Sequence, residues 1–232
     1  DDAQTALAYL EETIMLEGPE TIAAFILEPV TGTNGILIPP DGYLQGVREL
    51  CDRHGILLIA DEVMSGFGRT GEWFAVNHWG VVPDIITMAK GLTSSAVPLG
   101  AVGLSPKVYR YFDEHVFYGG LTYNSHPLAL AAALATIRVY EEDGLLEHSR
   151  KMGEVMARHH HELSDKHRSV GLVRNIGLFG IVAIGRTPLE AEALAEVLEG
   201  TDLVFDASAA LVVQRYLADL ARERGVPYVA VW

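Results

Sequence analysis

Two observations predict an α/β fold in which a mostly parallel sheet is covered by helices. Over about the first two-thirds of the chain, short apolar runs typical of buried strands alternate with segments of helical periodicity. The chain also has 232 residues, 49% of them hydrophobic, which is enough to bury a substantial core. This length fits one large domain or two small ones.

The first half of the chain supplies the expected sheet. Residues 3–17 have helical periodicity, and the apolar run at residues 23–27 is typical of a buried strand. Residues 43–54 predict a helix, which Gly55 ends. Further strands are expected at residues 56–60, 85–88 and 100–104.

The second half predicts longer helices and a smaller sheet. Residues 127–140 form a helix of small side chains suited to close packing, and residues 145–166 form a long amphipathic helix. Residues 170–173 and 178–184 are expected to pair as antiparallel strands of a second, smaller domain. After residue 185 we expect helices at residues 188–198 and 210–224, and strands at residues 202–206 and 226–232.

The charge balance argues against two classes of partner. The chain carries 31 acidic and 17 basic side chains, for a net charge of -14. An acidic surface disfavours nucleic acid and anionic membranes, and the scattered Lys and Arg residues form no basic stripe. We therefore expect neither a nucleic-acid partner nor a membrane partner.

The cysteine content bears on the cellular location, and the first residues bear on whether the chain is complete. Cys51 is the only cysteine, so no intramolecular disulfide is possible and a cytoplasmic location is expected. It lies in an amphipathic helix pattern, which favours a core position over a nucleophile. No apolar run has the length of a membrane span, and the first residues, Asp1 and Asp2, are typical of the middle of a protein. We expect an incomplete chain.

A lysine and a carboxylate follow two of the expected strands. Asp61 comes directly after residues 56–60, and Lys90 follows residues 85–88. A pyridoxal phosphate (PLP) enzyme needs an amine to hold its cofactor as a Schiff base and an acid to keep the pyridine nitrogen protonated. The alternatives are a solvent-exposed lysine at a strand end, and a carboxylate that caps a helix or binds a loop. We interpret the pair as a PLP site.

Residues 20–184 resemble the class III (omega-amino acid) aminotransferases, over the second half of their large domain and the start of their small C-terminal domain. Each matching segment alone is weak, but together they occur in order and at compatible spacing. Two of them, MSG and GLTY, look most like the taurine–pyruvate and beta-alanine–pyruvate branch. The segments are LEPV at 27–30, ADEVMSGFGRTG at 60–71, PDI at 83–85, AKG at 89–91, PLGA at 98–101, GLTY at 120–123, HPLA at 126–129 and VRNIGL at 173–178.

The resemblance implies the PLP fold-type I class. Residues 1–140 would be a partial PLP-binding large domain, truncated at its N-terminus, and residues 141–185 the start of a small α+β C-terminal domain. The phosphate-binding turn and the ring-stacking aromatic that family members carry upstream are not found here. Residues 186–232 instead weakly resemble the later strand–helix–strand of adenylating enzymes that activate ubiquitin-like and sulfur-carrier proteins. They lack that family's nucleotide loop and catalytic cysteine, so the tail carries no implied activity.

The resemblance also implies roles for five residues. Lys90, expected to be buried, would hold the cofactor covalently and then act as general base and acid. Asp61 would pair with the pyridinium nitrogen. Val63 would pack against the cofactor ring, although ordinary core packing is an open alternative. Thr122 would donate from one subunit to the cofactor phosphate in the other, with Gly120 allowing close approach.

Other residues have less defined roles. Glu28 is a possible substrate-side carboxylate, and a structural role at its strand end is the alternative. Arg69 is expected to organise its loop and subunit contacts. Trp73, Phe74 and Trp79 are expected at that interface. The three histidines at 159–161 point in different directions on a charged helix, so no metal site is expected.

The function implied is PLP-dependent transfer of an amino group from an omega-amino acid or amine to a keto acid such as pyruvate. The working unit would be a homodimer, because Thr122 is useful only across a subunit boundary. Two alternatives stay open at this point. One is another fold-type I activity, such as an aminomutase or a decarboxylase, and the other is a catalytically silent binding or scaffold chain that lacks the phosphate loop.

Overall fold

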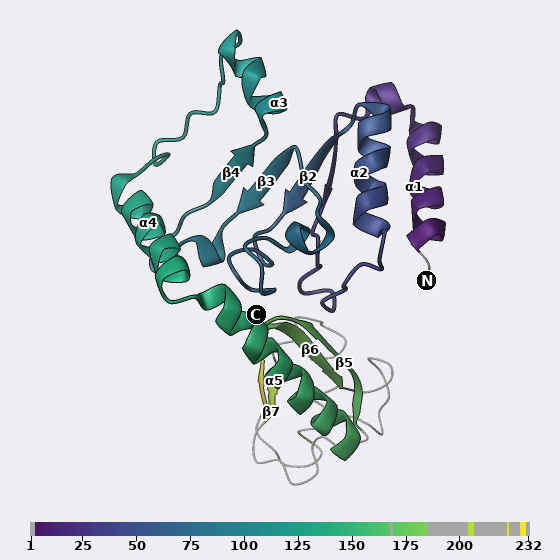
Figure 1. Ribbon diagram of the computed structural model, residues 1–232, viewed down its shortest axis with the longest axis vertical. Helices are drawn as coiled ribbons and strands as arrows, with labels where there is room; N and C mark the ends of the chain where they lie inside the picture. The colour runs from purple at the N-terminus through teal and green to yellow at the C-terminus, as the bar shows by residue number, and fades with distance from the viewer. Residues whose placement is uncertain (1–2, 168, 185–203, 207–221, 223–227, 231–232) are drawn as a thin grey trace. The chain divides into compact units, whose positions relative to one another are not determined.

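The computed structural model describes residues 3–167, 169–184, 204–206, 222 and 228–230 (Figure 1). The chain divides into two compact units, Asp1–Glu154 with Ile176–Phe179 and Val155–Asn175 with Gly180–Trp232. The predicted domain limits at residues 140 and 185 stay predictions. Along the part of the chain that the structure describes, no helix has the length and apolar character that crossing a membrane requires.

The first unit contains a four-stranded sheet in the order β1-β2-β3-β4. β1 pairs with β2 and β2 with β3 in parallel, while β4 runs antiparallel to β3. The prediction of a mostly parallel sheet is thus confirmed, with the antiparallel strand at one edge. The strands are β1 (Ala24–Leu27), β2 (Leu57–Asp61), β3 (Ile85–Met88) and β4 (Ala101–Leu104).

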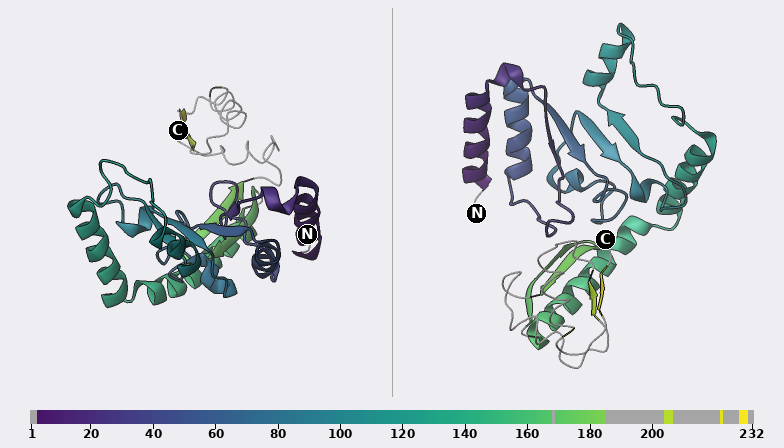
Figure 2. Two further views of the ribbon diagram at one scale, coloured as in Figure 1. Left: turned by 90° about the horizontal axis from the view of Figure 1, so that it is seen from above. Right: turned by 180° about the vertical axis from the view of Figure 1, so that it is seen from behind.

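Two helices, α1 (Ala3–Glu17) and α2 (Tyr43–His54), lie side by side against this sheet (Figures 1 and 2). As predicted, α2 ends at Gly55, whose φ of 69° is in the left-handed region that glycine tolerates. Cys51 is 1% exposed, so its predicted core position is confirmed, and burial raises the pKa of its thiol. The buried cluster between α1, α2 and β2 contains Ile14, Leu44, Val47, Leu50, Ile56, Leu58 and Ala60.

Asp84, just before β3, joins three neighbouring elements. Its Oδ2 accepts hydrogen bonds from the Leu58 backbone N–H at 2.9 Å and from Arg48 Nη1 at 2.8 Å. Lys107 Nζ lies 3.6 Å from Oδ1. Burial would raise the pKa of this carboxyl, but the Leu58 hydrogen bond and the Arg48 guanidinium outweigh it and lower the pKa. The ion pair therefore ties α2 and β2 to the start of β3.

Replacing Asp84 with asparagine is expected to lower the free energy of unfolding by about 1–3 kcal/mol at pH 7, because a charge-assisted, mostly buried hydrogen bond is lost. A carboxyl whose pKa is lowered by folding stabilises the fold above its unfolded pKa, about 3.9. That contribution disappears as the pH falls through the lower folded pKa. Urea unfolding between pH 7 and pH 3 should show the two proteins converging as the pH falls below about 3.9; parallel curves over this range would contradict it.

Two longer helices, α4 and α5, follow the sheet along the chain, and Ala133 of α4 packs in one cluster with Met88 and Ala101. α4 begins beyond His126, whose Nδ1 accepts a hydrogen bond from the Leu128 N–H at 3.3 Å, and it is followed by the long α5. Short 3-10 segments and one single-turn helix connect the strands. These elements are α3 (Pro106–Tyr109), α4 (Pro127–Glu142), α5 (Leu145–Lys166), η1 (Pro19–Thr21), η2 (Ala75–Trp79), η3 (Lys90–Leu92) and η4 (Arg110–Asp113).

Two further pairs of strands follow. β5 (Val170–Ile176) pairs with β6 (Phe179–Ile184), and β7 (Val204–Asp206) pairs in parallel with β8 (Tyr228–Ala230). β5 runs to Ile176, past the predicted end at residue 173, because the turn is made by Gly177, with φ of 56°, and its neighbour. The helices predicted at residues 188–198 and 210–224 lie outside the described residues, apart from Arg222.

Candidate active site

Asp61 and Lys90 leave the sheet at the same edge. Asp61 is the last residue of β2 and pairs with Thr87 of β3 in the parallel register. Lys90 follows the end of β3, as the first residue of η3. Because parallel neighbours present their carboxyl ends at one edge of the sheet, both residues begin there. This confirms the predicted placement at the strand ends.

The Asp61 carboxylate is half-buried and organises its own loop. Its Oδ1 accepts a hydrogen bond from the Val63 N–H at 3.0 Å, as in an Asx turn. Within the described residues no hydrogen bond reaches Oδ2. The loop-binding alternative therefore accounts for one oxygen, while the second is available to a ligand.

Lys90 adopts an unusual backbone conformation and is exposed. Its φ is 43°, in the left-handed region that residues with a side chain rarely adopt. The side chain is exposed within the described chain, which differs from the burial expected from the sequence. The difference arises because Lys90 stands past the end of β3, where the loop at residues 93–99 covers it only partly.

Two cavities open beside these residues. The larger, of about 700 Å³, is mainly apolar and includes Glu28 and Asp61 in its lining, at the carboxyl ends of β1 and β2. The smaller, of about 300 Å³, is lined by Lys90 and by the loop that follows it. Lysine and carboxylate thus line separate cavities at one edge of the sheet, which the sequence did not predict.

Glu28 also serves its own loop. Its Oε2 accepts a hydrogen bond from the Gly32 N–H at 2.9 Å. A Cβ at position 32 would lie 2.3 Å from the Met64 sulfur, so a larger residue there would require the Met64 side chain to move. Glu28 therefore has the structural role foreseen as an alternative, and it lines the larger cavity as well.

Gly120 and Thr122 lie in an exposed segment between η4 and α4. Both residues are exposed, and a Cβ added to Gly120 would meet no atom within 4 Å. Within the described residues no hydrogen bond joins either residue to Lys90 or Asp61. Large apolar side chains share this exposed segment, namely Val116, Phe117, Tyr118, Leu121 and Tyr123.

Comparison with known proteins identifies the family. The sequence model described as Aminotransferase class-III matches residues 1–212. The chain belongs to the class-III aminotransferases. The family match extends to residue 212, past the limit of 184 set by the sequence motifs.

Curated class-III relatives are similar over most of this chain. The chain is 44% identical over 202 residues to an omega-aminotransferase of Caulobacter vibrioides, with 85% of this chain and 45% of the relative covered. It is 41% identical over 200 residues to a taurine–pyruvate aminotransferase of Bilophila wadsworthia, with 82% and 43% covered. The chain therefore spans less than half the length of these relatives.

A solved class-III structure has the same fold. The crystal structure of taurine:2-oxoglutarate aminotransferase from Bifidobacterium kashiwanohense, in complex with PLP and glutamate, superposes with a TM-score of 0.77 at 44% identity. The match covers 78% of this chain and 41% of that structure. The predicted PLP fold-type I class is confirmed.

The sequence predicted no role for Glu62, which directly follows Asp61, the last residue of β2. The Glu62 side chain is 0% exposed. Its Oε2 accepts a hydrogen bond from Ser65 Oγ at 2.5 Å, and its Oε1 accepts one from the Val76 N–H at 2.9 Å. In the structure the period-two burial of Leu58 and Ala60 continues to Glu62, but residues 56–60 are all apolar, so the sequence had no alternation that could have marked Glu62.

An aromatic cluster that contains Phe67, Trp73, Phe74 and Tyr140 packs against Leu92, two residues after Lys90. Trp73 and Phe74, expected at a subunit interface, pack within the chain: Phe74 contacts Phe67 at 5.5 Å and Trp73 contacts Tyr140 at 5.8 Å between ring centroids. Trp79 packs against the core beside α2. All three rings are half-buried within the chain, and their expected place at a subunit interface stays a prediction.

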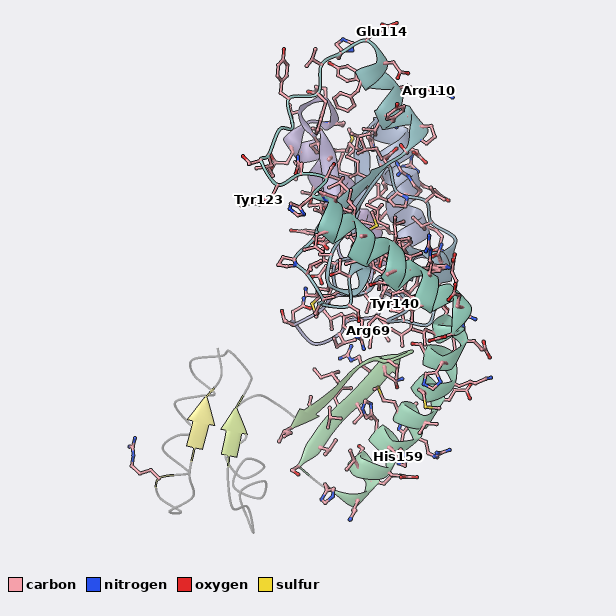
Figure 3. All side chains as sticks on the ribbon, turned by 90° about the vertical axis from the view of Figure 1, so that its left-hand side faces the viewer. Arg69, Arg110, Glu114, Tyr123, Tyr140 and His159 are labelled. Atoms are coloured by element: carbon pink, nitrogen blue, oxygen red, sulfur yellow. The ribbon has the colours of Figure 1, made fainter. Side chains whose placement is uncertain are left out.

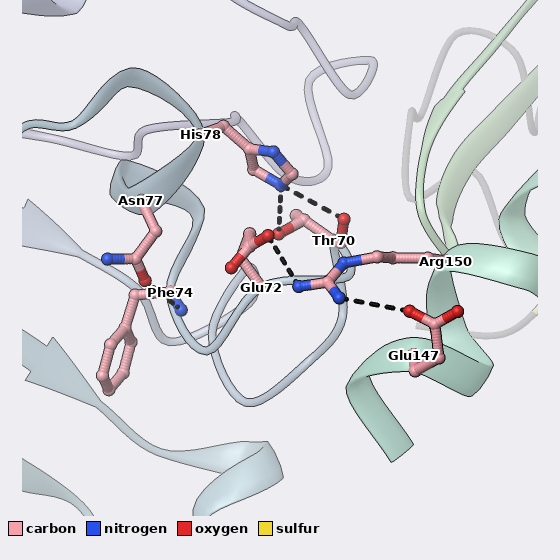
Figure 4. A network of polar contacts seen from close by, with 7 residues as sticks. All are labelled: Thr70, Glu72, Phe74, Asn77, His78, Glu147 and Arg150. Carbon is pink, nitrogen blue, oxygen red and sulfur yellow. Dashed lines mark hydrogen bonds and ion pairs between the residues drawn. The ribbon is translucent and has the colours of Figure 1, made fainter. Parts of the chain in front are cut away.

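The loop that follows Glu62 is fastened to the start of α5 (Figure 4). Arg150 Nη2 lies 2.7 Å from Glu72 Oε1, and its Nη1 lies 3.3 Å from Glu147 Oε2. His78 Nε2 lies 3.1 Å from Thr70 Oγ1. Arg69, which was expected to organise this loop, is exposed, and its backbone oxygen accepts from the Leu178 N–H at 3.0 Å.

Metal ligation has no visible basis in the described residues. Over this part of the chain, no group of three or more His, Cys, Asp or Glu side chains is placed to hold a metal ion.

Proposed function

We propose that this chain carries the lysine-bearing part of a PLP-dependent aminotransferase. The reaction would move an amino group from an omega-amino acid or amine to a keto acid such as pyruvate. The observation that carries the proposal is the placement of Asp61 and Lys90 at the ends of neighbouring parallel strands in a class-III fold. Relatives named as omega-, taurine–pyruvate and putrescine–pyruvate aminotransferases support this donor and acceptor class.

The residues present fit PLP. Lys90 offers an exposed amine, and among the described residues it takes part in no ion pair. Asp61 keeps one carboxylate oxygen available beside a mainly apolar cavity of about 700 Å³. When bound, PLP supplies an electron-withdrawing ring that stabilises negative charge at the carbon bearing the amino group.

Each residue would then have a distinct task. Lys90 Nζ would hold the cofactor covalently and, once released, take and return the proton at the substrate carbon. The open oxygen of Asp61 would keep the pyridine nitrogen protonated, while its bound oxygen keeps the Val63 turn in place. Val63 would pack against the ring. Glu28 would face the substrate side of the larger cavity.

We further propose that the working enzyme is a cytoplasmic homodimer. Thr122 and Gly120 are exposed among apolar side chains such as Tyr118, which is 93% exposed. An exposed apolar segment of this kind is typical of an interaction surface. Contact with a second subunit would cover it and let Thr122 donate to the cofactor phosphate of that subunit.

Lys90→Ala is expected to abolish site-specific attachment of PLP. The chain would be incubated with PLP, reduced with borohydride, digested and examined by mass spectrometry. In the wild-type chain the label should favour Lys90 over Lys107, Lys151 and Lys166, because Lys90 follows the strand that pairs with the Asp61 strand. Lys107→Ala is the matched control and should keep the Lys90 label.

Even labelling of all four lysines in the wild-type chain would contradict the assignment of Lys90. The activity is tested separately by incubating the PLP-loaded chain with pyruvate and taurine, beta-alanine or putrescine and measuring alanine. Formation of alanine that depends on Lys90 supports the transaminase.

A further inference from the structure

The backbone at Lys90 has a conformation that is unfavourable for a residue with a side chain. Lys90 has a φ of 43°, and the residues Ser94 and Ser95 that follow also have positive φ values of 50° and 64°. Such conformations persist only where the surrounding structure enforces them. Two backbone hydrogen bonds contribute, from the Leu92 N–H to the Ala89 oxygen at 2.9 Å and from the Thr93 N–H to the Lys90 oxygen at 3.3 Å.

Gly91, the next residue, is enclosed on two sides. A Cβ at this position would lie 2.8 Å from the Phe67 Cβ and 3.4 Å from the Tyr140 hydroxyl. The backbone of the turn that carries Lys90 therefore packs directly against Phe67 and Tyr140 of the aromatic cluster. Only glycine allows this approach.

Tyr140 makes a side-chain contact at this junction, where the Gly91 carbonyl oxygen also accepts a hydrogen bond from the Ser94 N–H at 3.2 Å. The Tyr140 hydroxyl donates a hydrogen bond to the Gly91 carbonyl oxygen at 3.2 Å, across 49 residues of sequence. The ring lies 6.2 Å from Phe67 and 5.8 Å from Trp73, so the cluster fixes where the hydroxyl points. Burial raises the pKa of the Tyr140 phenol, which keeps it a protonated donor at neutral pH. Tyr140 lies toward the C-terminal end of α4 (Figure 3).

We propose that Tyr140 is a positioning residue that holds the Lys90 turn through the Gly91 carbonyl. This inference rests on the proposed function, because it assigns Tyr140 a task only if Lys90 is the reactive amine. The hydroxyl restrains the peptide that follows Lys90, while the packed ring restrains the hydroxyl. Together they keep Lys90 at the edge of the sheet where β2 also ends, at Asp61.

Tyr140→Phe tests this, because it removes the hydroxyl and keeps the ring in the cluster. Hydrogen–deuterium exchange of the Leu92 and Thr93 amides is expected to become about fivefold faster, the change that corresponds to one hydrogen bond of about 1 kcal/mol. Borohydride-trapped PLP on Lys90, relative to Lys107 in the same sample, should fall by about the same factor. Exchange in β1 and β2 should stay unchanged.

Thr136→Ala is the matched control, since Thr136 lies on the same helix but donates its hydroxyl within that helix, to the Ala132 oxygen at 2.9 Å. It should leave both readouts at wild-type values. Unchanged exchange at Leu92 and Thr93 in Tyr140→Phe would overturn the inference, and so would equal acceleration throughout β1 and β2, because Tyr140 would then stabilise the whole unit. If wild-type Lys90 takes no PLP, the proposed function fails while amide exchange still decides the role of Tyr140.

Discussion

Replacing Gly177 with alanine is expected to lower the free energy of unfolding by at least about 4 kcal/mol. Gly177 has a φ of 56°, which an L-residue adopts only at a cost. A Cβ would also lie 2.4 Å from the carbonyl carbon of Thr70 and 2.9 Å from the Gly71 nitrogen. Both of these are backbone atoms, so the clash cannot be relieved by turning a side chain.

Two other glycines separate the causes. Gly144 has a φ of 61° but open space around it, so Gly144→Ala should cost only about 1 kcal/mol for the conformation. Gly153 is helical, yet its Cβ would lie 2.7 Å from the Gly177 Cα, so Gly153→Ala isolates the steric cost. Urea unfolding midpoints of the three variants provide the measurement. If the free energies of unfolding of the Gly177 and Gly144 variants differ by less than about 1 kcal/mol, the contact between Gly177 and the backbone of Thr70 and Gly71 relaxes easily.

Glu62→Ala is expected to destabilise the fold by about 3–5 kcal/mol, because it leaves two buried donors without acceptors. Ser65 Oγ and the Val76 N–H both bond to this carboxylate, and both residues are buried. The loop between them follows Asp61 directly. We therefore also expect weaker preference of PLP for Lys90 in this variant, measured by the same borohydride trapping.

Glu62→Gln provides the matched comparison. The amide oxygen can still accept from the Val76 N–H, and the amide nitrogen can donate to Ser65 Oγ, so the loss should be about 1–2 kcal/mol. Equal unfolding midpoints for the alanine and glutamine variants would contradict the hydrogen-bond explanation, because the amide of glutamine would then recover nothing from the Val76 N–H and Ser65 Oγ.

The sheet was predictable because its pattern is local. Apolar runs of period two or of full burial identified β1, β2 and β3, and the left-handed Gly55 marked the end of α2. The limit of β5 was less predictable, since Asn175 and Ile176 stand directly before Gly177 and the three residues together read as a turn from sequence alone. The structure continues the strand because pairing with β6 outweighs local preference.

The candidate site was predictable only where it follows strand ends. Asp61 and Lys90 could be placed from the apolar runs before them, and the structure keeps them on neighbouring strands. The contact between Tyr140 and Gly91 joins residues far apart in sequence, so no local sequence pattern predicts it. The exposure of Lys90 also depends on what surrounds the sheet edge, which strand periodicity does not encode.

The register that pairs Asp61 with Thr87 fixes the backbone of Asp61 relative to the strand that precedes Lys90. It does not depend on the connecting residues that line part of the larger cavity. Hydrogen-bonded strands lie about 4.8 Å apart whatever side chains they carry, so this spacing survives substitutions elsewhere. The walls of the larger cavity come instead from connecting segments such as residues 37–40. A mutant library that reshapes those walls therefore leaves the strand ladder, and with it the spacing between the Asp61 and Thr87 backbones, unchanged.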